Sequence, residues 1–221
     1  MEKGSGCFYA TPKVSRVRVA RTGTTTVGIV CSDGVILATD RRVTSGFFIA
    51  NKRGKKIYKI EEHIAATIAG VVADAQMLMD RLNAQARLYR LMNGRRISVR
   101  AAATLASNIL FGSRYFPLIL QAIVAGVDDE GPSMYSLDPF GTMTRERYIA
   151  TGSGSPMALG VLEGGYREGI RIEEALPLVC KAMTSSMRWD PASGEGFDVA
   201  IITERGIEER AGEGLPEAYF R

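Results

Sequence analysis

The order of its predicted helices and strands is the feature that most constrains the fold of this 221-residue chain. Apolar residues that alternate or run together predict strands, and apolar residues spaced by three and four predict helices. The predicted order is strands, two helices, strands, two helices, and a final strand. A doubly wound parallel sheet would alternate single strands with single helices, so the pattern argues against it. It favours an α+β fold in which mainly antiparallel sheets are covered by paired helices.

Turn and cap residues set the boundaries of these elements. Asp33-Gly34 marks a hairpin between the first two strands, Gly94 a helix C-cap and Ser98 a helix N-cap. Pro177 fits its helix only in the first turn. We predict helices over 72–92, 99–111, 156–166 and 173–187, and strands over 25–31, 35–39, 57–60, 64–69, 118–127, 133–137, 143–149 and 197–203.

Charge and periodicity divide the chain into a leader and one domain. Residues 1–23 lack sustained periodicity and hold five basic residues and one acidic residue, which accounts for the whole net charge of +4. Residues 24–221 have no net charge, whereas a domain that binds nucleic acid needs a basic face of its own. We therefore expect a leader over 1–23 and a single domain over 24–221, large enough to bury a core without disulfides.

Several classes of protein are excluded by what the sequence lacks. No uninterrupted apolar stretch is long enough for a membrane span, and the leader has no run that resembles a signal peptide. Cys7, Cys31 and Cys180 are far apart and form no CxxC pair or Cys/His cluster. We therefore expect no metal site, no cofactor and no disulfide framework, and a cytoplasmic location. Cys31 and Cys180 are interpreted as small buried apolar residues.

A possible nucleophile follows the leader. His63 is the only histidine and is interpreted as a surface residue, so the usual imidazole base for a hydroxyl nucleophile is missing. Cleavage of the Gly23–Thr24 bond would give Thr24 both a hydroxyl and a free α-amine, whose ordinary pKa is about 7.7–8.0. One residue could then be nucleophile and base together. Most threonine-rich runs are ordinary β-strands, so this motif alone does not establish catalysis.

Six short motifs follow one another in the chain in a recognisable order. They are GTTTVG at 23–28, ATDRR at 38–42, GKK at 54–56, IAG at 68–70, TGSGS at 151–155 and DPASG at 190–194. Together they resemble the proteasome β subunits, most closely the archaeal ones, over about residues 22–203. The resemblance implies the N-terminal-nucleophile hydrolase fold, a four-layer αββα sandwich with two antiparallel sheets between paired helices. It also implies self-cleavage at Gly23–Thr24 and threonine endopeptidase activity.

The resemblance assigns a catalytic role to each matching position. The threonine would attack the scissile carbonyl, a lysine would stabilise its alkoxide, an aspartate would pair with that lysine, and a glycine N–H would bind the oxyanion. Two serines and a second aspartate would orient the amine and a nearby water. The threonine is Thr24, the lysine is Lys56, the aspartate that pairs with it is Asp40, and the glycine is Gly70. The two serines are Ser153 and Ser193, and the second aspartate is Asp190. Each has an ordinary structural alternative, such as an exposed strand lysine or a turn residue.

Substrate preference follows from the same resemblance. The positions matching the family's first specificity pocket are Val43, Ala50, Ile68 and Val72, and Thr44 matches a contact to the substrate backbone. All four pocket positions are apolar, and such a pocket selects by shape and buried area. We therefore predict cleavage after hydrophobic residues.

The resemblance also implies partners, and it leaves other functions open. It implies a seven-membered β ring, alone or with a second β subunit, α rings, a regulatory ATPase and unfolded polypeptide substrates, without nucleic acid or membrane. The alternatives are a structural β subunit that keeps its leader, the bacterial ATP-dependent relative with six-fold rings, and an amidohydrolase of small molecules. Every matching position holds the residue type found in active subunits, which favours the enzyme over a structural subunit. The motifs at 151–155 and 190–194 favour the proteasome over the bacterial relative.

Overall fold

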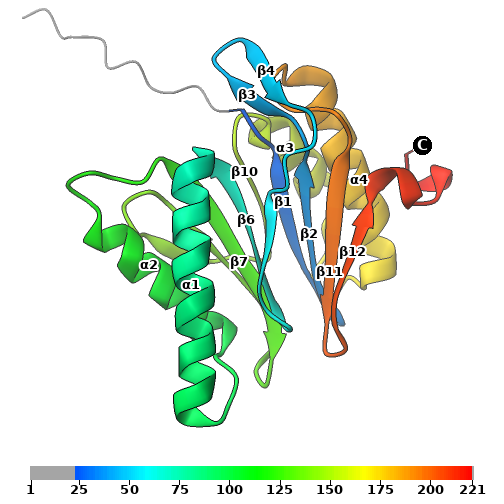
Figure 1. Cartoon of the computed structure of the whole chain (residues 1–221). Coiled ribbons are helices and arrows are strands. Elements are labelled where there is room, and N and C mark those ends of the chain that lie inside the picture. Colours follow the sequence, from blue (N-terminus) through cyan, green and yellow to red (C-terminus); the bar gives the residue numbers. More distant parts are fainter. Residues whose placement is uncertain (1–22, 221) are drawn as a thin grey trace, which may run out of the picture.

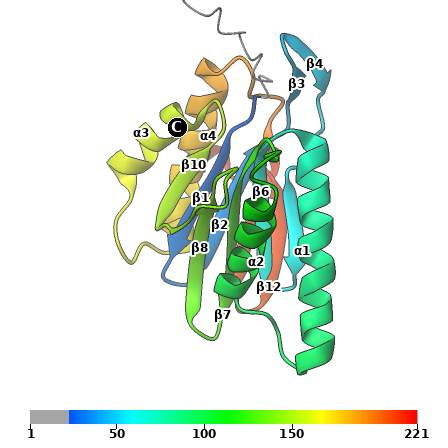
Figure 2. The same ribbon diagram turned by 90° about the vertical axis from the view of Figure 1, so that its left-hand side faces the viewer.

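Two five-stranded antiparallel sheets form the centre of the computed structural model, which describes residues 23–220. One sheet has the strand order β10-β1-β2-β11-β12 and the other β5-β6-β7-β8-β9, while β3 and β4 form a separate hairpin. This hairpin projects at the end of the molecule where β1 begins (Figures 1 and 2). The expected leader lies outside the described residues, except for Gly23.

The elements have the following bounds. The helices are α1 (Val72–Asn93), α2 (Val99–Gly112), α3 (Ser155–Gly165) and α4 (Ile172–Trp189), with short 3₁₀ helices η1 (Gly212–Gly214) and η2 (Glu217–Phe220). The first sheet comprises β1 (Thr26–Cys31), β2 (Gly34–Asp40), β10 (Tyr148–Thr151), β11 (Phe197–Thr203) and β12 (Gly206–Ala211). The second comprises β5 (Ile57–Glu61), β6 (Ile64–Gly70), β7 (Leu120–Asp128), β8 (Gly131–Leu137) and β9 (Met143–Arg145), and the hairpin β3 (Val43–Ser45) and β4 (Phe48–Asn51).

The two sheets lie between two pairs of helices (Figure 1). Three layers of apolar side chains hold these four layers together. One lies between α1/α2 and the second sheet, one between α3/α4 and the first sheet, and one between the two sheets. The central strand β2 is buried along its whole length because both of its faces are covered. The expected αββα sandwich is thereby confirmed.

The structure departs from the predicted elements in the region of 143–149. The single expected strand is two strands, β9 and β10, which belong to different sheets. The break at Glu146-Arg147 lets the chain cross from one sheet to the other. The hairpin β3–β4 and the strand β12 were not predicted, because they are short or carry mostly polar and exposed residues.

Two residues have surroundings that differ from the prediction. Pro177 lies inside α4 beyond its first turn, because the helix begins at Ile172. The carbonyl that loses its partner there is that of Glu173, an exposed residue whose backbone water can reach. His63 was predicted at the surface but is buried, with Nε2 2.9 Å from the carbonyl oxygen of Ile97. The segment before α2 covers it, a long-range contact that the local sequence does not reveal.

The two described cysteines are buried, as predicted. Burial raises the pKa of Cys31 to about 12 and that of Cys180 to about 11, so both thiols stay protonated and unreactive. Cys7 lies outside the described residues. Within residues 23–220, none of the helices has the length and apolar character that crossing a bilayer requires.

Candidate active site

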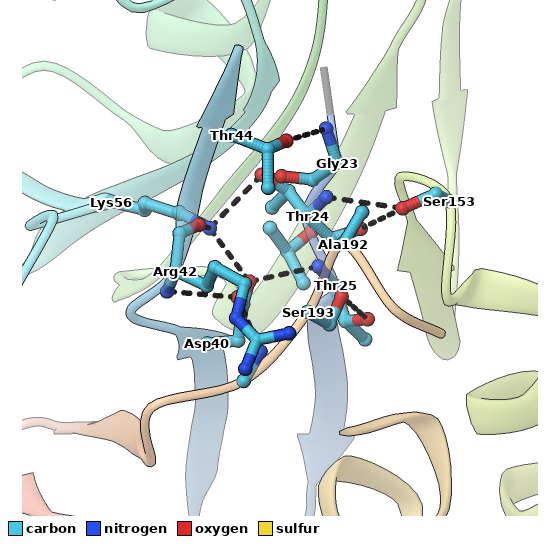
Figure 3. Close-up of polar contacts among 12 residues, drawn as sticks. Gly23, Thr24, Thr25, Asp40, Arg42, Thr44, Lys56, Ser153, Ala192 and Ser193 are labelled. Atoms are coloured by element: carbon cyan, nitrogen blue, oxygen red, sulfur yellow. Dashed lines mark hydrogen bonds and ion pairs between the residues drawn. The ribbon is translucent and has the colours of Figure 1, made fainter. Parts of the chain in front are cut away.

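The predicted catalytic residues lie near ends of strands from the two sheets, and Figure 3 shows Thr24, Asp40, Lys56, Ser153 and Ser193 close together there. Thr24 comes just before β1, and Asp40 ends the neighbouring strand β2. Their antiparallel register pairs Thr26 with Thr39, which places Asp40 beside the backbone of Thr25. Lys56 comes just before β5 of the other sheet. The site therefore depends on how the two sheets pack against each other.

The ammonium group of Lys56 is fixed by three acceptors. Its Nζ donates to Thr24 Oγ1 at 3.0 Å, to Asp40 Oδ1 at 2.7 Å and to the carbonyl oxygen of Arg42 at 2.6 Å. An ammonium group has three N–H donors, so all of them are used. The neighbouring Lys55 points to solvent and pairs with Glu209. Of the two lysines, the buried one contacts the threonine, as the resemblance implied.

Asp40 is held as a carboxylate by donors on both oxygens. Oδ1 accepts from the Thr25 N–H at 2.9 Å as well as from Lys56, and Oδ2 accepts from the N–H groups of Arg42 and Gly194, each at 3.1 Å. The side chain is fully buried. A buried carboxylate without such partners would be strongly destabilising, so this set of contacts explains how the charge is tolerated.

Burial and pairing act in opposite directions on this ion pair. Burial raises the pKa of Asp40, while the Lys56 charge and the hydrogen bonds from Lys56, Thr25 and Gly194 act to lower it. Burial lowers the pKa of Lys56, while the charge and hydrogen bond of Asp40 and the charge of Asp190 act to raise it. Both shifts narrow the pH range in which the two groups are ionised together.

A second carboxylate cluster lies on the other side of Thr24. Asp190 Oδ2 accepts hydrogen bonds from the hydroxyls of Ser153 and Ser193, each at 2.6 Å, and Oδ1 accepts from the Ala192 N–H at 3.1 Å. The Thr24 N–H in turn donates to Ser153 Oγ at 3.2 Å. The structure thus brings the two predicted serines and the second aspartate together, and Ser153 links this cluster to the Thr24 nitrogen.

The uncleaved Gly23–Thr24 bond is held tightly in this site. The Thr24 hydroxyl donates to the carbonyl oxygen of Gly23 at 2.6 Å, so the hydroxyl lies against the carbonyl group of the residue before it. The Gly23 N–H donates to Thr44 Oγ1 at 3.1 Å. A Cβ atom at residue 23 would lie 1.8 Å from the Cβ of Ala192, so a side chain there would clash (Figure 3). Glycine is therefore required at the bond that the nucleophile faces.

A cavity of about 730 Å³ opens beside Thr24 and Lys56. Four of the predicted substrate contacts line it, namely Val43, Thr44, Ile68 and Val72. Gly70, the predicted oxyanion residue, also lines it. Ala50 is exposed on β4 and does not line this cavity, because the β3–β4 register has a bulge next to Val43. Sequence reasoning missed further lining residues, among them the aromatic Tyr58, the apolar Ala75 and Met79, and the charged Arg53 and Asp80.

Arg42 is a residue near the site that sequence reasoning passed over. Its N–H donates to Asp40 and its carbonyl accepts from Lys56. Its guanidinium donates to the carbonyl of Pro191 at 2.7 Å and pairs with Glu195 at 3.3 Å. Arg42 thus ties the end of β2 to the loop that carries Asp190. The ATDRR motif contained it, but nothing in the sequence showed what the side chain reaches.

Comparison with known proteins decides the family. A family model described as proteasome subunit matches residues 20–202. A proteasome subunit beta of Methanothermobacter thermautotrophicus is 53% identical over 182 residues, which cover 82% of this chain and 87% of the relative. Proteasome subunit beta 2 of Aeropyrum pernix is 51% identical over 193 residues, covering 87% and 88%. A proteasome subunit beta of Methanocaldococcus vulcanius is 53% identical over 188 residues, which cover 84% of this chain and 84% of the relative.

The chain belongs to the proteasome β subunit family. The resemblance inferred from six short motifs is thereby confirmed. Proteasome β subunits assemble with other proteasome subunits, and members of the family are generally peptidases. The described part of this β subunit contains no group of three or more His, Cys, Asp or Glu side chains placed to hold a metal ion.

Proposed function

We propose that this β subunit is a threonine endopeptidase that first releases its own leader. The observation that carries the proposal is the contact of the buried Lys56 ammonium with Thr24 Oγ1 at 3.0 Å. A cation at that distance favours the alkoxide that develops when the hydroxyl attacks a carbonyl. Asp40 keeps the ammonium in place, so the nucleophile is positioned before substrate binds.

Leader release begins with attack by the Thr24 hydroxyl on the carbonyl carbon of Gly23. The Oγ–C bond forms, the C–N bond breaks, and the hydroxyl proton ends on the nitrogen of Thr24. The product is an ester between Gly23 and Thr24 with a free α-amine. Water then cleaves the ester, giving a leader that ends in the Gly23 carboxylate and a chain that begins at Thr24. The hydrogen bond from the hydroxyl to the Gly23 carbonyl supports this order of events.

Peptide hydrolysis repeats the attack on a bound polypeptide. Thr24 Oγ adds to the scissile carbonyl while its α-amine takes the hydroxyl proton and passes it to the departing amine. The Gly70 N–H stabilises the oxyanion. Water then hydrolyses the ester and regenerates the threonine. Ser153, which accepts from the Thr24 nitrogen in the uncleaved chain, and Asp190, which accepts from Ser153, orient the amine and this water.

We expect cleavage after hydrophobic residues of unfolded proteins. Val43, Ile68, Val72 and the additional wall residue Met79 give the cavity apolar surface, which rewards the burial of an apolar side chain. Peptides that differ only in the residue before the cleaved bond test this. A preference for a basic or acidic residue at that position would contradict it.

The rest of the proposal concerns assembly. Seven copies, alone or with a second β subunit, form a ring between α rings in the cytoplasm, and a regulatory ATPase delivers unfolded polypeptide. Coexpression with an α subunit followed by intact-mass measurement tests maturation. A chain that begins at Thr24 supports the enzyme, while a chain that keeps its leader supports a structural β subunit. The Thr24→Ala variant should keep the leader and hydrolyse no peptide.

A further inference from the structure

A row of buried hydroxyl groups lies behind Asp190, and two of its members, Thr25 and Ser186, have no part in the function proposed above. Thr25 Oγ1 is 2.5 Å from Ser186 Oγ and 2.7 Å from Ser193 Oγ. Ser193 Oγ is in turn 2.6 Å from Asp190 Oδ2. Thr25 and Ser186 are both fully buried. The row therefore runs, shielded from water, from helix α4 to the carboxylate beside Thr24.

The number of hydrogen atoms fixes the direction of this row. Each hydroxyl carries one hydrogen, and an ionised carboxylate only accepts. Ser193 therefore donates to Asp190 and must accept from Thr25, and Thr25 must then accept from Ser186. The carbonyl of Gly154, 3.0 Å from Ser186 Oγ, competes for the same hydrogen, but the 2.5 Å contact between Ser186 Oγ and Thr25 Oγ1 also needs a hydrogen, and only Ser186 has one left to give. All three hydroxyls thus point toward Asp190.

The local backbone is shaped around this row. A Cβ atom at Gly154 would lie 2.0 Å from Ser186 Oγ and 2.1 Å from Thr25 Oγ1. The glycine leaves room for the two hydroxyls to meet at the start of α3. Packing thus holds their oxygen atoms in contact.

Thr25 contacts both carboxylate clusters of the site. Its backbone N–H donates to Asp40 Oδ1 at 2.9 Å, and Asp40 fixes the Lys56 ammonium. Its hydroxyl reaches Asp190 through Ser193. Figure 3 shows Thr25 directly after the nucleophile, bonded to Asp40 and to Ser193.

We infer that Thr25 is a positioning residue whose hydroxyl, supported by Ser186, keeps Ser193 and Asp190 in the orientation that the Thr24 nitrogen requires. The inference rests on the proposed role of Thr24. Asp190 Oδ2 accepts from both serine hydroxyls, so Ser153 stays oriented to accept from the Thr24 nitrogen only while that carboxylate stays in place. Loss of the Thr25 hydroxyl leaves Ser193 without its donor and free to rotate. The described residues that line the substrate cavity include neither Thr25 nor Ser186.

The test is the kinetics of Thr25→Val, which removes the hydroxyl at nearly constant volume. The variant is coexpressed with an α subunit, and rates are normalised to the fraction of chains that begin at Thr24. We expect kcat for peptide hydrolysis to fall by about tenfold or more, because small displacements of catalytic groups are costly, with KM unchanged. Thr25→Ser should recover most of the loss. Ser186→Ala should lose less than Thr25→Val, because Thr25 can still donate to Ser193.

Thr26→Val is the matched control, since it makes the same substitution at the next residue. Thr26 is also fully buried, but its hydroxyl bonds to Thr151 at 2.6 Å on the other face of β1. A wild-type kcat in Thr25→Val would overturn the inference, and so would an equal loss in Thr26→Val, a raised KM alone or no recovery in Thr25→Ser. Activity that persists in Thr24→Ala would instead overturn the proposed function. Thermal unfolding of each variant shows that the chains compared are folded.

Discussion

At the scale of single residues, Lys56 is a buried cation that both pairs with Asp40 and contacts the proposed nucleophile. Lys56→Met removes the partner of Asp40 and leaves a buried carboxylate unpaired, which destabilises a protein by about 3–5 kcal/mol. We expect a loss of that size in the free energy of unfolding, measured in urea, together with a retained leader in the intact mass. The control Lys55→Met breaks an exposed pair with Glu209, typically worth at most about 1 kcal/mol. Equal stability of the two variants would contradict the buried pair.

The same ion pair sets the pH range of leader release. The nitrogen of Thr24 is an amide before cleavage, so no α-amine titrates, and the rate should report Asp40 and Lys56. Burial raises the pKa of Asp40, so the rate should fall on the acid side above the pH expected for an ordinary aspartate. Burial lowers the pKa of Lys56, so the rate should fall on the alkaline side below the pH of an ordinary lysine. Mass spectrometry of the uncleaved chain at a series of pH values measures this; a rate still rising past the ordinary lysine pKa would contradict it.

At the scale of elements, the loop between α4 and β11 decides which residue can precede the nucleophile. Gly23→Ala should block leader release, because the new Cβ would lie 1.8 Å from the Cβ of Ala192. The double variant Gly23→Ala/Ala192→Gly lacks the Ala192 Cβ, so it should recover part of the rate of leader release. Intact mass measured over time gives this rate. Equal rates in the single and double variants would show that crowding by the loop is not the cause. Ala192→Gly alone is the control for changes in the loop itself.

Local patterns account for the long elements and miss the short ones. The helices and most strands followed from apolar spacing, Asp-Gly and the caps at Ser98 and Gly94, because these signals are local. The crossing between β9 and β10 and the burial of His63 depend on distant segments, so no local pattern indicated them. The hairpin β3–β4 was missed for the opposite reason, since its residues are largely exposed and carry little apolar pattern.

At the scale of the whole molecule, the site could be predicted only through the family motifs. Thr24 and Asp40 lie at strand ends of one sheet and Lys56 at a strand end of the other, and no spacing in the sequence shows that these strand ends meet. The motifs named the residues, while the fold supplied their contacts. Arg42 and Ser186 carried no such signal, because their contribution is a contact with a loop or a hydroxyl far along the chain.

The meeting of the two sheets gives a prediction for the core. Ile57 and Ile60 lie on the same strand and are each 2% exposed, but Ile57 packs between the two sheets and Ile60 packs under the helices. Substitution of either by alanine should lower the free energy of unfolding by about 2–5 kcal/mol. Only Ile57→Ala loosens the layer that sets the distance from Lys56 to Thr24, so leader release per folded chain should slow there and stay near wild type in Ile60→Ala. Urea unfolding and intact mass measure the two quantities separately, and equal slowing in both variants would mean that activity follows overall stability rather than the packing of one sheet on the other.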